Sequence, residues 1–182
     1  MKMKKRTLLL FGLFSLLFSQ TFSYAGSSEL GEIKKIFIKD GFGKTKSSFD
    51  LEYKGDGICR VMFLGSSPSS TSILIFERIY SFLPLEGNSL YQILNSSKCI
   101  TPLMKICAPF HYYAFRHDNE TPNFPFVESV SDALEGKKEK VKFGDCKISV
   151  IKRDRFIQFN VEINKKDAIK NLKELKELLK GK

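Results

Sequence analysis

The chain of 182 residues lacks the short motifs by which many catalytic sites are recognised. It contains no G-x-S-x-G elbow for a nucleophilic serine and no H-E-x-x-H pair for zinc. The GFG at 41–43 lacks the further glycine and the Lys-Ser ending of a phosphate-binding loop. Internal repeats and low-complexity linkers are absent as well. These absences argue against an enzyme, and we expect no bound cofactor.

Histidine is scarce, and both histidines fall in CITPLMKICAPFHYYAFRHDNETPNFPF at 99–126. The spacing C-x7-C-x3-H-x5-H is too wide at its cysteines for a structural zinc finger. A looser site could use His111 and His117 with Asp118 or Glu120 to hold zinc, copper or another divalent ion. No pair of these residues has the H-E-x-x-H spacing that places two ligands on one helical face, so the spacing does not preorganise a site. A metal-binding protein or metal-dependent enzyme is therefore the alternative hypothesis.

The N-terminus predicts export. MKMKKR is basic, TLLLFGLFSLLF is apolar, and Ser23-Tyr24-Ala25 resembles a signal peptidase site. The apolar run is shorter than the ~20 residues of a membrane-spanning helix, and no cysteine follows for lipid attachment. We therefore expect residues 1–25 to be a cleaved signal peptide and 26–182 to form a single domain without a transmembrane span. A lysine-rich signal favours a bacterial protein, located in the periplasm or outside the cell.

All four cysteines lie in the predicted mature chain, and an even count in an exported protein favours two disulfides. Cys59 and Cys146 occupy core-facing positions of two predicted strands, so they could meet across the core. Cys99 and Cys107 are close in sequence, with a proline between them. The predicted pairs are Cys59–Cys146 and Cys99–Cys107. Four free buried thiols are the competing interpretation.

Hydrophobic periodicity predicts an α+β fold in which hairpins build an antiparallel sheet and a C-terminal amphipathic helix packs against it. Alternating residues predict strands at 48–54, 58–64 and 155–163, and shorter strands at 141–143 and 146–152. The run ILIFERIYSFL at 73–83 is compatible with a strand or a buried helix, with its β-branched content favouring a strand. Residues 33–39 are compatible with either, and 88–96 with a short helix. Asn164 is expected to cap the last helix, whose apolar stripe is Ala168, Leu172, Leu175 and Leu179.

Aromatic residues are dense between residues 108 and 126, among prolines and beside an arginine. Such side chains bury large areas at interfaces with little loss of entropy, and they can also stack on sugars. We therefore predict an aromatic loop that binds a protein or a glycan, although about half of its aromatic residues could line the core instead. The predicted binding residues are Phe110, Tyr112, Tyr113, Phe115, Arg116 and His117.

Positive charge is concentrated at the C-terminus, where residues 137–182 hold 15 basic and seven acidic side chains. This region could contact an anionic surface, because charge of one sign raises encounter rates with the opposite sign. A solvated helix face with local glutamate partners explains the same pattern. A nucleic-acid partner is not expected after export. The predicted function is that of an exported, non-catalytic binding protein.

Overall fold

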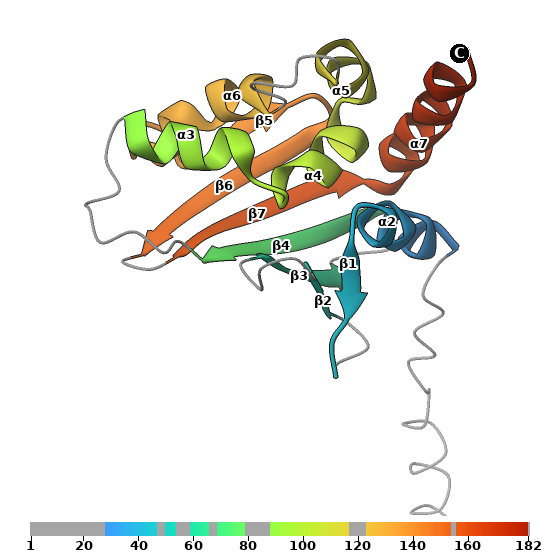
Figure 1. Cartoon of the computed structure of the whole chain (residues 1–182), viewed down its shortest axis with the longest axis horizontal. Coiled ribbons are helices and arrows are strands. Elements are labelled where there is room, and N and C mark those ends of the chain that lie inside the picture. The colour runs from blue at the N-terminus through green and yellow to red at the C-terminus, as the bar shows by residue number, and fades with distance from the viewer. Residues whose placement is uncertain are drawn as a thin grey trace, which may run out of the picture.

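The computed structural model describes residues 28–46, 50–53, 59–65, 69–78, 88–116, 123–153 and 156–181. Within these ranges the chain forms one seven-stranded antiparallel sheet with helices packed on it, which confirms the α+β prediction (Figure 1). The predicted signal peptide at 1–25 lies outside the described residues. None of the described helices combines the length and the apolar character needed to cross a bilayer.

The sheet consists of two meanders joined at the centre of the sheet. Its order is β1-β2-β3-β4-β7-β6-β5, with every neighbouring pair antiparallel. The long central pair β4–β7 keeps register over nine residues, from Ser70 opposite Asn164 to Arg78 opposite Phe156. The strands are β1 (Phe42–Lys44), β2 (Asp50–Tyr53), β3 (Cys59–Gly65), β4 (Ser70–Arg78), β5 (Val141–Phe143), β6 (Cys146–Arg153) and β7 (Phe156–Asn164).

One face of this sheet carries the core. Successive strand residues point to opposite faces, so the paired residues Val61 and Ile75, and Phe159 beyond them, fall on the same side. All three are fully buried. On the other face, here called the outer face, β7 presents polar side chains such as Gln158 and Asn160. This division is typical of an antiparallel sheet covered on one side only.

The described helices lie on the core face (Figure 1). Their apolar residues meet the inner face of the sheet, as Phe37 does against Phe63 and Phe126 against Phe159. The region at 33–39, compatible with a strand or a helix in the sequence, is helical, with Ile33 buried one turn before Phe37. The helices are α2 (Ser28–Lys39), α3 (Asn88–Ser96), α4 (Ile100–Cys107), α5 (Pro109–Phe115), α6 (Phe124–Leu134) and α7 (Lys165–Lys180).

Helix α7 begins and packs as the sequence predicts. The Asn164 side chain accepts a hydrogen bond from the Lys166 backbone N–H, which satisfies one of the unpaired donors of the first turn. Ala168, Leu172 and Leu175 are buried. Leu179, assigned to the same stripe in the sequence, is instead 45% exposed in the last turn.

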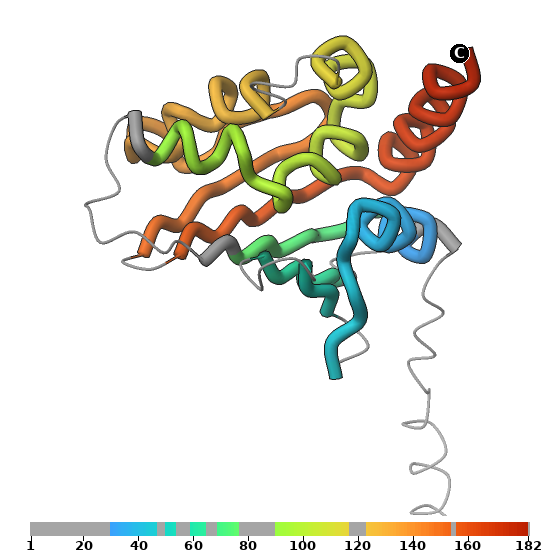
Figure 2. The backbone as a smooth tube through the Cα atoms, viewed as in Figure 1, coloured from blue at the N-terminus to red at the C-terminus, as the bar shows by residue number. Residues whose placement is uncertain are grey.

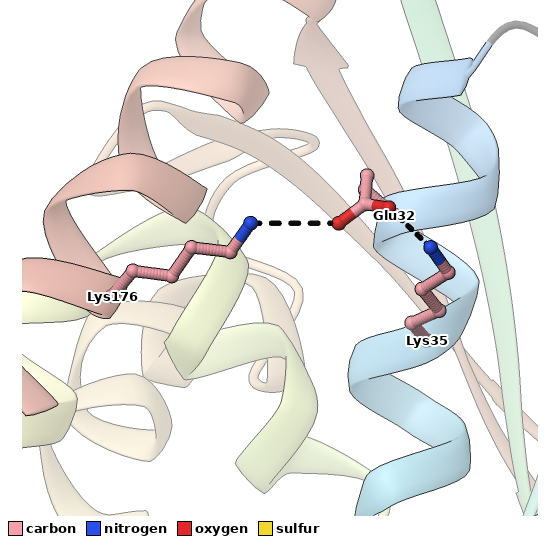
Figure 3. Close-up of polar contacts among 3 residues, drawn as sticks. All are labelled: Glu32, Lys35 and Lys176. Carbon is pink, nitrogen blue, oxygen red and sulfur yellow. Dashed lines mark hydrogen bonds and ion pairs between the residues drawn. The ribbon is translucent and has the colours of Figure 1, made fainter.

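The first and last described helices lie side by side although they are far apart in sequence (Figure 2). Glu32 of α2 joins them, since its carboxylate lies 2.5 Å from the Lys35 ammonium and 3.6 Å from that of Lys176 on α7 (Figure 3). The hydrogen bond from Lys35 holds the pKa of the Glu32 carboxyl below its usual range. This contact is exposed, so it orients the two helices more than it stabilises them.

Both disulfides form, but with a pairing other than the predicted one. The bonds are Cys59–Cys99, with Cα atoms 5.7 Å apart, and Cys107–Cys146, with Cα atoms 5.3 Å apart. Cys59 and Cys146 do face the core, as their position in the strands predicted. They lie on β3 and β6, however, which β4 and β7 separate. At about 4.8 Å per strand, that distance is roughly twice what a disulfide spans.

The other predicted pair fails for a similar reason. Cys99 and Cys107 flank the eight-residue helix α4, which at about 1.5 Å per residue holds its two ends about 12 Å apart. Cys99 is instead bonded to Cys59 in β3, and Cys107 is bonded to Cys146 in β6. Helix α4 is therefore attached at one end to the first meander and at the other to the second.

Candidate functional site: the aromatic surface of helix α5

The predicted aromatic loop is a helix over the part that the structure describes. Residues 109–115 form α5, and α6 starts at Phe124. Pro109 occupies the first turn of α5, where its missing N–H costs nothing and its fixed φ suits the helix. The loop prediction was wrong here because proline and aromatic residues were taken as signs of irregular structure, whereas Pro109 starts a helix.

The carbonyl group of Cys107, just before α5, is held by several partners. Cys107 is bonded to Cys146, and its carbonyl oxygen accepts the backbone N–H of Asp145 at 2.9 Å. The buried Asn171 side chain of α7 donates to the carbonyl oxygens of Ile106 at 2.9 Å and Cys107 at 3.4 Å. Helix α5 therefore extends from a rigid base formed by α4, α7 and the β5–β6 turn.

Helix α5 buries only its proline. Phe110 is 62% exposed, His111 is also exposed, and the following aromatic residues are half-buried. We call the accessible side chains of this helix and its C-cap the aromatic surface: Phe110, His111, Tyr112, Tyr113, Phe115 and Arg116. Of the aromatic residues in 108–126, Phe126 is fully buried in the core, and Tyr112 packs against the core with part of its side chain accessible. The structure thus favours the surface interpretation of the aromatic segment over the core interpretation.

Neighbouring groups hold several of these rings in place. The His111 ring lies 6.0 Å from that of Phe143 in β5, which in turn packs edge-on against Phe126. Arg116 stacks over Tyr113 at 4.9 Å, and the Lys105 ammonium lies 4.8 Å from the centre of the Tyr112 ring. Cation–π contacts of this kind fix ring orientation without hiding the outward edge. The aromatic surface is therefore partly preorganised.

Lys105 also anchors the base of this surface. Its ammonium pairs with the carboxylate of Asp40, in the turn after α2, and both side chains are largely buried at 14% and 16% exposure. Within the described part of the chain, the second carboxylate oxygen of Asp40 has no hydrogen-bond partner. The same ammonium also faces the Tyr112 ring. Helices α4 and α5 and the turn after α2 therefore meet at one charged group.

The predicted metal ligands are only partly placed. His117, Asp118 and Glu120 lie outside the described residues, while His111 is exposed beside aromatic rings. Among the described residues, no three histidine, cysteine or acidic side chains come close enough to hold a metal ion. The cysteines are all in disulfides, so none offers a thiolate.

Strand β6 contains a short sequence motif that is associated with nucleophilic serines. Ser149-Val150-Ile151-Lys152 in β6 has the S-x-x-K spacing of some acyl-transfer enzymes. That spacing brings serine and lysine together on a helix. In a strand, residues three apart point to opposite faces of the sheet, so Ser149 and Lys152 do not form a catalytic pair.

Helix α7 carries six of the 15 basic side chains of the basic C-terminal region. Lys166, Lys170 and Lys173 are exposed, and no described carboxylate lies within ion-pair distance of them. Helix α7 packs beside α5, so the aromatic and basic features lie on neighbouring helices (Figure 1). The sequence did not reveal this proximity, because the two helices are far apart along the chain.

No protein-family model, curated protein or solved structure matches this chain.

Proposed function

We propose that this chain is an exported, non-catalytic binding protein that engages a partner protein through the aromatic surface of α5. The observation that carries the proposal is the exposure of that helix, which leaves five aromatic rings accessible, counting His111, on a base fixed by a disulfide. Exposed aromatic and arginine side chains on a rigid element are the usual composition of an interface hot spot. Two fully buried disulfides support export to an oxidising compartment.

A protein partner fits this surface better than a glycan. The rings lie on a convex helix and not in a concave site, and Arg116 beside them suits an acidic or carbonyl group of a protein. The basic face of α7 next to α5 would attract an acidic partner to the same end of the molecule. Binding should therefore weaken as salt concentration rises.

The test is photo-crosslinking in the cells that produce the protein. A photoreactive phenylalanine at position 110 should form a protein adduct, whereas the same residue at position 38, where Ile38 is 44% exposed on α2, should not. In binding assays with the partner protein recovered in the adduct, Phe110→Ala with Tyr113→Ala should weaken affinity at least tenfold. Ile38→Ala is the matched control and should leave affinity unchanged.

Three results would count against this proposal. Equal adducts at both positions would remove the reason to single out α5. A carbohydrate adduct at position 110 would favour the glycan instead. Stoichiometric metal in the purified protein, lost in His111→Ala or His117→Ala, would support the metal-dependent alternative with His111, His117, Asp118 and Glu120.

A further inference from the structure

The outer face of the sheet carries a second feature, independent of α5. The polarity of its outward-pointing side chains differs between the two meanders, which join at β4 and β7. On β3 and β4 apolar outward residues, namely Met62, Leu64, Leu74 and Phe76, stand among polar ones such as Ser72. On β7 and β6 the outward residues are mainly polar, as the register pairs Asn160 with Ser149 and Glu162 with Lys147. No described helix covers this face (Figure 1).

A depression of about 220 Å³ lies across the junction of the two meanders. Leu64, Leu74 and the polar Ser72 line one side of it, and Ser149 and Asn160 line the other. Two ammonium groups, from Lys140 and Lys147, and the Glu162 carboxylate complete the polar side. The volume is smaller than the ~300 Å³ of a typical drug-sized site, so it suits a ligand group the size of one sugar ring.

The polar groups of the depression are available to a ligand. Lys147 and Glu162 sit opposite each other on neighbouring strands, yet among the described residues neither has an ion-pair partner, and Lys140 has none either. The Asn160 amide is oriented by neighbours, because its Nδ2 donates to the Ser149 hydroxyl at 3.2 Å and its oxygen accepts from Gln158. The Ser149 hydroxyl proton remains free to donate.

We propose that this depression binds an acidic saccharide. The two lysines match a carboxylate on the sugar, and the amide, serine hydroxyl and Glu162 carboxylate match its hydroxyl groups. Leu64 and Leu74 supply an apolar floor for the C–H face of the ring. A second copy of the chain fits less well, because face-to-face packing would bury unpaired lysine and glutamate side chains, which interface centres exclude.

The test uses the purified protein and two defined probes, a galacturonate trimer and the neutral galactose trimer. Calorimetric titration should show saturable binding of the acidic trimer, at least fivefold tighter than that of the neutral one. Backbone amide NMR signals should shift on β6 and β7 and not on α5. Lys147→Gln should weaken binding about tenfold, since it removes a charge-assisted contact.

Lys142→Gln is the matched control. Lys142 pairs with Lys147 in the β5–β6 ladder but does not line the depression, so its loss removes the same charge from the same region. Affinity should then change by less than about twofold, because a charge that makes no direct contact with the ligand acts on it only weakly through water. Equal weakening by Lys142→Gln and Lys147→Gln would reduce the effect to general electrostatics and overturn the proposal. Three other results would also overturn the proposal. They are equal binding of both trimers, absence of NMR shifts on β6 and β7, and a dimer in solution that Lys147→Gln dissociates.

Discussion

Gly144 occupies a position that has no room for a side chain. It turns the chain between β5 and β6 at φ +55, a left-handed conformation that glycine adopts readily. A Cβ atom there would lie 2.0 Å from the Cys107 carbonyl oxygen, which already accepts a hydrogen bond from Asp145. The turn can therefore reach the end of α4 only because residue 144 has no side chain.

We expect Gly144→Ala to lower the free energy of unfolding by on the order of 3 kcal/mol, from backbone strain and the forced displacement of the Cys107 carbonyl. Gly136→Ala is the control, because Gly136 also has a positive φ of +74 but open space around its Cβ position. Its cost should be about 1 kcal/mol, from the left-handed conformation alone. Urea denaturation of the unaltered protein and of the two variants measures both losses of unfolding free energy. Equal losses in the two variants would contradict the steric argument.

At the scale of elements, the Lys105–Asp40 pair is the buried charge that joins α2, α4 and α5. A buried ion pair contributes little compared with a well-packed apolar pair, but breaking it leaves a charge without a partner. Exposed pairs such as Lys180–Glu177 on α7, at 71% and 72% exposure, are screened by solvent. The two kinds of pair should therefore respond very differently to the same substitution.

Lys105→Met should destabilise the protein by about 3–5 kcal/mol, because Asp40 would remain buried and unpaired. Adding Asp40→Leu should recover most of that loss, whereas Lys180→Met alone should cost less than about 0.5 kcal/mol. Thermal or urea unfolding of the single and double variants gives the comparison. If the double variant were no more stable than Lys105→Met, the loss would come from packing of the lysine chain and not from its charge.

The elements that the sequence predicts best are those whose pattern depends on one covered face. Residues 156–164 alternate because one side of β7 meets helices and the other meets water. The run at 73–83 is less clear, since β4 contributes Leu74 and Phe76 to the outer face and so loses its alternation. For α5 the sequence indicated the density of aromatic residues but not their exposure. That exposure depends on how α4, α7 and the β5–β6 turn pack, which no local pattern contains.

At the scale of the molecule, the disulfides depend on strand order. The alternation of residues along each strand correctly predicted that Cys59 and Cys146 face the core. The order of the strands in the sheet is a nonlocal property, and no local pattern contains it. The outer-face depression was hidden for the same reason, since Lys147 and Leu64 meet only because β4 and β7 join the two meanders. The chain folds into one sheet whose halves are both bonded to α4.

Removing either disulfide should therefore cost about the same. The loops closed by Cys59–Cys99 and Cys107–Cys146 span 40 and 39 residues, which corresponds to about 4 kcal/mol each on the chain-entropy estimate. Urea unfolding of Cys59→Ala with Cys99→Ala, and of Cys107→Ala with Cys146→Ala, measures the two losses. Peptide mapping of the unreduced protein should recover the same two linkages, and a fragment joining Cys59 to Cys146 would contradict them.

The two loops follow each other along the chain, with α4 as the segment between them. A peptide bond cut between Cys59 and Cys99 leaves its two pieces joined through that disulfide, and the same holds between Cys107 and Cys146. Strands β3, β4 and β5 and helices α3, α4, α5 and α6 lie within or between these loops. A protease that nicks the chain once inside either loop would thus leave the two pieces covalently joined.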